Sequence, residues 1–170
     1  TNPARQQSFF ISRELPASTS LDLLPALVSN QAGDRQTGSD KVVLRERRVL
    51  IKRVAQIVRR MHRDGINHRD LYLCHFWLQN GDKPLNQKRL FLIDLHRMQF
   101  RSRVPLRWRV KDLGGLYYSA SDCGLRKTDL LRFVKDYTGE PLRTSLVRDV
   151  ALWSAVKIRA TRMTKAGKEG

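Results

Sequence analysis

The sequence predicts a mostly helical α+β domain with one small β-hairpin, and two observations support this prediction. First, apolar residues from Lys41 to Arg63 recur at helical spacing, and Gly65 follows as a residue that can end the helix. Second, two short apolar runs, Phe76–Leu78 and Leu90–Ile93, flank the turn-forming segment Asn80–Pro84. A chain of 170 residues, 41% of them hydrophobic, is long enough for one domain with a core.

The N-terminal part is less regular. Ser8–Ser12 is apolar and β-favouring, which predicts a short strand. Ser20 is placed to cap a short helix over Leu21–Val28. The segment Asn30–Asp40 is rich in Gly, Gln, Ser and Asp, so we expect a surface loop.

The C-terminal half predicts further helices. Asp112 is expected to open a helix over Leu113–Ala120, because an acid is favourable at the positive end of the helix dipole. Leu125–Tyr137 and Arg143–Met163 predict two more helices. Lys165–Gly170 is expected to be a mobile tail.

The composition limits the classes of function. The chain has 33 Lys and Arg against 16 Asp and Glu, and the net charge of +17 indicates an anionic partner. Nucleic acid, an anionic membrane surface and an acidic substrate or protein all fit this charge. The two cysteines, Cys74 and Cys123, form no disulfide framework and no Cys-x-x-Cys site, which favours free thiols in a reducing compartment. No apolar run approaches the ~18 residues of a membrane span.

A catalytic pattern follows the long predicted helix. His68-Arg69-Asp70-Leu71 matches the first part of the kinase catalytic loop H-R-D-L-x-x-x-N, with His75 where Asn is usual. The apolar run before Asp94 is typical of a strand that delivers a carboxylate to the edge of a site. Phosphoryl transfer needs two such acids, one to accept the hydrogen bond of the attacking hydroxyl and one to hold magnesium against nucleotide phosphates.

The neighbouring residues leave alternatives open. His75 fits either a metal or phosphate position or a hydrogen bond that holds the loop, since imidazole is a poor magnesium ligand. His68 and Arg69 are expected to support the loop, and Cys74 is expected to be a small buried residue. Six cations between Leu95 and Lys111 fit either a substrate-binding surface or an ordinary solvated one; they are Arg97, Arg101, Arg103, Arg107, Arg109 and Lys111.

Three longer strings give the sequence a family resemblance. They are Asn67–Phe76 (NHRDLYLCHF), Leu92–Arg97 (LIDLHR) and Arg107–Tyr117 (RWRVKDLGGLY). The sequence resembles the lipopolysaccharide core heptose kinases, the WaaP/RfaP family, from about Phe9 to about Tyr137. The resemblance implies the large, C-terminal lobe of a protein-kinase-like fold, with a hinge strand and a small β-hairpin. It also implies ATP-dependent phosphorylation of a heptose of the lipopolysaccharide inner core.

The resemblance assigns roles to individual residues. It implies that Asp70 is the catalytic base or the acid that orients the hydroxyl, and that Asp94 is the magnesium ligand. His75 is expected at the second metal or phosphate position. Asp112 is expected to open its helix and to brace the catalytic loop from below.

The resemblance also implies a division of the chain. Residues 1–16 are expected to hold the end of the small lobe and the hinge, where the backbone near Glu14 and Leu15 would pair with adenine. Residues 17–164 are expected to form the large lobe, and 165–170 the tail. A kinase needs a phosphate-covering loop and a lysine before the hinge, and nothing ahead of the hinge supplies them here. We therefore expect the chain to be a fragment that lacks the small lobe.

The favoured hypothesis is a cytoplasmic kinase, peripheral at the inner face of the inner membrane, which uses ATP and Mg²⁺ on the lipopolysaccharide core saccharide. Arg97, Arg101 and Arg103 are its candidate substrate cations, and an anionic membrane surface and an acidic protein are its expected further partners. One alternative is a degenerate kinase-like remnant without turnover. Another is a basic protein that binds nucleic acid or an anionic surface. No nucleic acid is expected, because aromatic residues are only 8% and no nucleic-acid-binding motif occurs.

Overall fold

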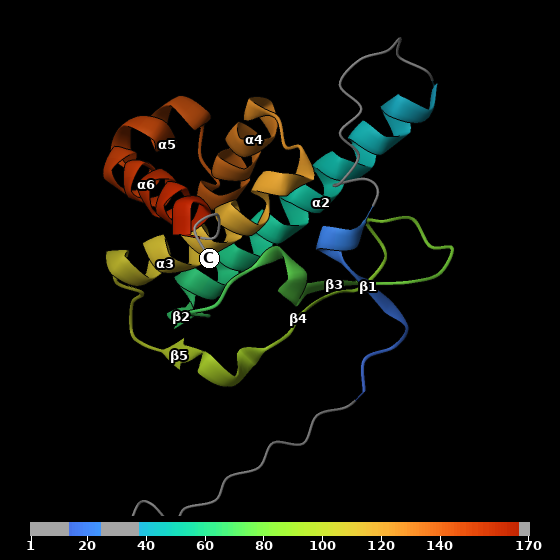
Figure 1. The fold of residues 1–170 in the computed structure, drawn as a ribbon, viewed down its shortest axis with the longest axis horizontal. Coiled ribbons are helices and arrows are strands. Elements are labelled where there is room, and N and C mark those ends of the chain that lie inside the picture. Colours follow the sequence, from blue (N-terminus) through green and yellow to red (C-terminus); the bar gives the residue numbers. More distant parts are fainter. Residues whose placement is uncertain (1–13, 25–37, 167–170) are drawn as a thin grey trace, which may run out of the picture.

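The computed structural model describes residues 14–24 and 38–166, and in it a group of helices lies against two small sheets (Figure 1). The helices are α2 Gly38–Arg63, α3 Leu106–Ser119, α4 Lys127–Thr138, α5 Leu142–Arg148 and α6 Val150–Ala166. The strands are β1 Ser18–Ser20, β2 Ile66–Asn67, β3 Phe76–Gln79, β4 Leu90–Leu92 and β5 Gln99–Phe100. Short 3-10 turns lie at Leu21–Leu23, Leu73–His75, Leu95–Arg97 and Ser121–Cys123.

The long helix predicted from apolar periodicity is α2, and the prediction is confirmed. Its buried face packs on α4, while α3 packs on α6. The helix ends before Gly65, whose φ of 79° is the left-handed conformation that glycine adopts without strain. A Cβ atom at Gly65 would lie only 1.8 Å from the backbone oxygen of Arg101, so the chain also passes too closely here for a larger residue.

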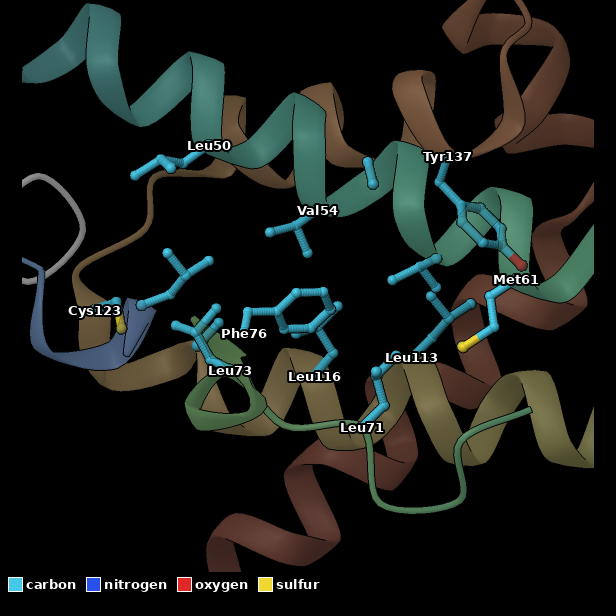
Figure 2. Close-up of a cluster of buried hydrophobic side chains, with 14 of the residues drawn as sticks. Leu50, Val54, Met61, Leu71, Leu73, Phe76, Leu113, Leu116, Cys123 and Tyr137 are labelled. Atoms are coloured by element: carbon cyan, nitrogen blue, oxygen red, sulfur yellow. The ribbon is translucent and has the colours of Figure 1, made fainter. Parts of the chain in front are cut away.

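Phe76 joins the hairpin to the helical core. Its side chain is fully buried, and Figure 2 shows it between Leu50 and Val54 of α2 on one side and Leu113 and Leu116 of α3 on the other. Burial of such a side chain contributes about 1.5–3 kcal/mol. Because the turn at Leu73–His75 directly precedes this anchor, the core fixes the position of the loop that carries the catalytic pattern.

The predicted hairpin is also confirmed. β3 and β4 pair antiparallel, with Phe76 opposite Leu92 and Leu78 opposite Leu90. The sheet gains a third strand, β1, in which Ser20 lies opposite Trp77. A second sheet joins β2 to β5. Periodicity did not predict β1, β2 or β5, because each has only two or three residues and β1 is Ser-Thr-Ser.

Two helix predictions need correction. α3 begins at Leu106 rather than at Asp112, because Pro105 precedes its first turn with a φ of −61° that suits a helix start. Three of the six cations, Arg107, Arg109 and Lys111, therefore lie on this helix. The helix predicted over residues 143–163 is two helices, α5 and α6, which meet at Asp149, where φ is −103° and ψ is 24°. The helix predicted over residues 125–137 is confirmed as α4.

Other predictions fall wholly or partly outside the described residues. The strand predicted over residues 8–12 lies outside them. Of the helix predicted over 21–28, the structure describes a 3-10 turn, Leu21–Leu23. Residues 38–40, predicted as loop, and residues 165–166, predicted as tail, belong to α2 and α6. No helix in the described part of the chain has both the length and the apolar character needed to cross a membrane.

Candidate functional site

A buried carboxylate holds the loop that carries the catalytic pattern. Asp112 is 0% exposed and lies within α3, where it accepts hydrogen bonds from the backbone N–H of His68 at 2.8 Å and of Arg69 at 2.7 Å. Nε2 of His62 lies 3.2 Å from the same carboxylate. Burying a carboxylate is costly unless hydrogen bonds compensate it, and these contacts supply them. The carboxylate therefore fixes the backbone of the loop from the middle of a helix, and not from a helix N-terminus as predicted.

The same loop is tied to the strand end that carries the second acid. His68 is fully buried, and its Nε2 donates to the backbone oxygen of Ile93 at 3.0 Å. Arg69 has a φ of 77°, a conformation that is uncommon for a residue with a side chain and that persists where its surroundings hold it. These contacts agree with loop support by both residues, although the roles themselves stay predictions.

Asp70 lies among cations. One carboxylate oxygen is 2.8 Å from Nη1 of Arg97, and the other is 3.9 Å from Nζ of Lys111. The Asp70 side chain is 19% exposed, so the carboxylate faces the surface without being fully solvated. An acceptor in this position can receive a hydrogen bond from a hydroxyl that approaches the loop.

Asp94 lies among histidines. It follows β4 and Ile93 with a left-handed backbone, at a φ of 62°. Its carboxylate contacts Nδ1 of His96, and its other oxygen is 3.6 Å from Nε2 of His75. The Asp94 side chain is 35% exposed, which leaves room for a further ligand.

His75 connects the two acids. Its Nδ1 lies 2.8 Å from the backbone oxygen of Asp70, and because a carbonyl only accepts, Nδ1 is the donor. Its Nε2 then faces Asp94. The ring therefore makes the loop-holding hydrogen bond of one alternative and lies beside the acid that the other alternative assigns to the metal, a role that stays a prediction.

The donor atoms fit magnesium that arrives with a nucleotide. Mg²⁺ is bound by one or two carboxylates together with substrate phosphates and waters. Asp94 offers a partly exposed carboxylate of this kind. Within residues 14–24 and 38–166, no group of three or more His, Cys, Asp or Glu side chains could hold a metal ion by itself.

The three predicted substrate arginines are not brought together. Arg97 contacts Asp70. Arg101 donates to Gln99 at 2.6 Å and lies 3.4 Å from Oδ1 of Asn67, so it braces β5 against β2. Arg103 lines a different pocket, near the C-terminal end of α2.

Cations instead gather around one indole ring. The side-chain charges of Arg69, Arg101, Arg107 and Lys111 lie 5.2–5.8 Å from the ring centroid of Trp108. Cation–π contacts of this kind contribute about 0.5–1 kcal/mol at exposed sites. Part of the basic run is therefore explained by packing on this tryptophan.

Two contacts of the site were missed by sequence reasoning. His96 lies two residues after Asp94, and the string Asp-Leu-His-Arg could have indicated its contact. Lys111 is 41 positions from Asp70, and no local signal predicts that they meet.

Glu14 is exposed and Leu15 half-buried ahead of β1, and their hinge role stays a prediction.

Cys74 is exposed, so the expectation of a buried thiol was wrong. The turn at Leu73–His75 leaves its side chain outside, while its backbone oxygen accepts hydrogen bonds from Ser20 at 3.0 Å and from Trp77 at 2.9 Å. Partial desolvation and the nearby charges of Asp22 and Asp94 raise the pKa of the thiol above its usual value.

Comparisons with known proteins identify relatives that match most of the chain. The chain is 42% identical over 163 residues to the lipopolysaccharide core heptose(I) kinase WaaP of Escherichia coli, which covers 95% of this chain and 58% of the relative. It is 41% identical over 165 residues to the protein of the same name from Pseudomonas aeruginosa, with 96% and 58% covered. The chain thus spans little more than half the length of these relatives.

A solved structure and a family model match as well. The structure of WaaP in complex with acyl carrier protein superposes with a TM-score of 0.80 at 38% identity, over 95% of this chain and 64% of that one. This match confirms the predicted kinase-like α+β fold. The model of the lipopolysaccharide kinase (Kdo/WaaP) family matches residues 2–137. The chain therefore belongs to the lipopolysaccharide kinase (Kdo/WaaP) family.

Proposed function

We propose that the chain carries the catalytic-loop part of an ATP-dependent kinase that phosphorylates a heptose of the lipopolysaccharide inner core. The observation that carries the proposal is His75, which binds the Asp70 backbone and faces the Asp94 carboxylate. A kinase needs these two acids held beside each other, one for the hydroxyl and one for the nucleotide's metal. The relatives that match most of the chain are named as kinases of this class.

Each acid has a separate role in this proposal. Asp70 accepts the hydrogen bond of the heptose hydroxyl and orients its oxygen for attack. Asp94, with His75 beside it, binds the magnesium that accompanies the nucleotide. When bound, Mg²⁺-ATP supplies the transferable phosphoryl group and neutralises its charge.

Cations next to Asp70 suit an anionic acceptor. Arg97 and Lys111 are both within ion-pair distance of its carboxylate. When a hydroxyl replaces them at that carboxylate, their charges are free to bind phosphate oxygens, which guanidinium groups bind well. We propose that these two residues, rather than Arg101 and Arg103, face the substrate.

The hinge and lobe assignments belong to the same proposal. Residues 1–16 carry the hinge, with the backbone of Glu14 and Leu15 at the adenine, and residues 17–164 form the large lobe. In support, β1 follows these residues and pairs with the hairpin that leads to Asp94.

Location and partners follow from charge and from the structural neighbour. The net charge of +17 suits a cytoplasmic protein that binds peripherally at the anionic inner face of the inner membrane. The similar solved structure is a complex with acyl carrier protein, and we propose a partner of that kind, with an acidic surface, for this chain.

The test is transfer of labelled phosphate from ATP to dephosphorylated lipopolysaccharide core, using a full-length protein that includes a small lobe. Mass spectrometry of the product should place one new phosphate on an inner-core heptose, and omission of magnesium should abolish transfer. Label that appears only in protein, or transfer to cores that lack heptose, would refute the proposed acceptor.

A further inference from the structure

The pocket that Arg103 lines has a volume of about 280 Å³, and its lining does not include Asp70 or Asp94. It is formed by the ends of α2 and α4, the approach to α3 and the junction of α5 with α6. Five arginines line it: Arg59, Arg63, Arg103, Arg109 and Arg148. Its lining includes neither Asp70 nor Asp94, nor the histidines and cations that contact them.

Three of these arginines have no acidic partner among the described residues. Arg63 pairs with Asp64, and Arg148 pairs with Glu140 and with Asp149 at 2.8 Å. Arg59, Arg103 and Arg109 form no ion pair with any residue that the structure describes. Asp149 is the one acid in the described lining, and Arg148 already binds it. The pocket therefore holds uncompensated positive charge.

The pocket is also partly rigid. Arg109 donates its Nε–H to the hydroxyl of Tyr137 at 3.1 Å, and that hydroxyl lies 2.9 Å from Nδ1 of His62. Nε2 of His62 in turn contacts the Asp112 carboxylate, and the side chains of Tyr137, His62 and Asp112 are all buried. The chain of hydrogen bonds holds the Arg109 guanidinium in one orientation, so less entropy is lost when it binds a ligand.

We propose that this arginine pocket binds a phosphate group, presented either by a soluble phosphate compound or by a phosphate-bearing lipid surface. Guanidinium groups bind phosphate through paired N–H···O hydrogen bonds, and several that converge without acids are typical of phosphate recognition. The volume admits a phosphate with part of the group that carries it. This proposal does not depend on the kinase assignment, since no residue of the pocket contacts Asp70 or Asp94.

Some of these arginines could be present only to stabilise helix C-termini. This explanation and phosphate binding can be separated by experiment. Helix C-termini attract cations, and Arg59 lies against Gly139, the C-cap of α4. If the arginines served only the helix ends, their loss would lower thermal stability and leave phosphate binding unchanged. If they bind phosphate, their loss removes binding whatever the change in stability.

The experiment compares two double variants of the 170-residue chain that lose the same charge. Arg59→Gln/Arg103→Gln removes two exposed pocket arginines, whereas Arg48→Gln/Arg60→Gln removes two exposed arginines of α2 outside the pocket. Calorimetric titration uses inorganic phosphate and then pyrophosphate, at constant ionic strength set with chloride. We expect saturable binding that weakens at least about tenfold per arginine lost in the pocket variant and less than about threefold in the control.

Nuclear magnetic resonance supplies a local readout. Phosphate should shift the Nε–H signals of Arg59, Arg103 and Arg109 and, through Tyr137, the ring signals of His62.

Vesicles of phosphatidylcholine with phosphatidylglycerol distinguish the source of the phosphate. If pyrophosphate releases the chain from these vesicles and the pocket variant alone loses retention, the lipid surface supplies the group. If retention is equal in both variants while the calorimetric difference holds, a soluble compound supplies it.

Two results would overturn the proposal. One is equal weakening of phosphate binding in the pocket variant and the control. The other is non-saturable binding with shifts spread over all surface arginines, which would show general charge attraction only. Melting temperatures within a few degrees of the parent chain, measured by circular dichroism, verify that both variants fold.

Discussion

Asp70 and Asp94, the two acids of the proposed site, are linked by His75 but have different neighbours. Asp70 is flanked by Arg97 and Lys111, whereas Asp94 is flanked by two histidines and is more exposed. A carboxylate among permanent cations suits an acceptor for a hydroxyl near phosphate. A carboxylate with more open surface suits a metal ligand, because Mg²⁺ is bound by carboxylate oxygens together with waters and substrate phosphates.

Because of this difference, substitution of Asp70 and substitution of Asp94 should impair the kinase in different ways. In a full-length protein that includes a small lobe, Asp70→Asn should lower turnover about 10²–10⁴-fold and leave Mg²⁺-ATP binding intact. Asp94→Asn should abolish transfer and weaken Mg²⁺-ATP binding as well. His75→Asn should be the mildest of the three, because it restores the residue that is usual at that spacing. Equilibrium nucleotide binding and phosphate transfer, measured side by side, check this, and full activity in either Asp variant refutes that residue's role.

Cys74 offers a pH-dependent probe of the same site. Its pKa is raised by partial desolvation and by the negative charges of Asp22 and Asp94, so less of the reactive thiolate is present at a given pH. The chain should therefore react with iodoacetamide more slowly at pH 8 than an unperturbed cysteine does. The rate of Cys74 alkylation should rise as pH rises through the raised pKa.

Removing either negative charge should lower that pKa. Asp22→Asn and Asp94→Asn should each speed the alkylation of Cys74 at pH 8, whereas Asp64→Asn, a distant exposed acid, should not. Mass spectrometry of the peptide that carries Cys74 gives the rate separately from Cys123. An unchanged rate in both variants would show that the charges of Asp22 and Asp94 do not raise the pKa of Cys74.

At the scale of elements, α3 and the catalytic loop are joined by Asp112. The carboxylate is fully buried and satisfies two backbone N–H groups and one imidazole. Removing a buried acceptor leaves those donors without partners, and each costs about 1–3 kcal/mol. Asp112→Ala should lower the free energy of unfolding by about 3–5 kcal/mol.

Urea denaturation measures that loss. Asp64→Ala is the matched control, because Asp64 forms only surface ion pairs, worth less than about 1 kcal/mol. Asp112→Asn should fall between the two, since its amide keeps one acceptor oxygen. A loss for Asp112→Ala no larger than for the control would mean that the loop does not depend on this carboxylate.

Elements with a strong apolar period were predictable, and elements fixed by pairing were not. α2, α4 and the hairpin of β3 and β4 follow from their own apolar residues. The strands β1, β2 and β5 exist because a distant partner supplies their hydrogen bonds, which no local pattern records. The start of α3 was not predicted, because Asp112 was expected to open the helix, whereas Pro105 precedes its first turn.

The candidate site also has a part that the sequence predicts and a part that it does not. Asp70, His75 and Asp94 could be predicted because motif spacing along the chain carries them. The contacts of Lys111 with Asp70 and of His62 with Asp112 could not be predicted, because the partners are 41 and 50 positions apart along the chain. Nor does the sequence indicate that Arg101 contacts Gln99 and Asn67, or that Arg103 lines a pocket that does not include Asp70.

At the scale of the whole molecule, the excess charge dominates. A net charge of +17 over 170 residues raises the potential around the entire surface, in addition to any local pocket. Anionic lipids attract exposed Lys and Arg by about 1 kcal/mol each near the surface. Binding to such a surface through these cations is expected to be electrostatic.

This predicts salt-sensitive binding to anionic vesicles. The chain should be retained on phosphatidylglycerol vesicles at low salt and released as salt rises, because exposed charges are screened beyond about 10 Å at 0.1 M. Neutral phosphatidylcholine vesicles are the control and should retain little of it at any salt concentration. Co-sedimentation across a salt series measures the effect, and any single exposed Arg→Gln change should shift the release point only slightly, because many cations share the attraction. Retention on neutral vesicles that persists at high salt would contradict electrostatic binding and indicate a hydrophobic anchor instead.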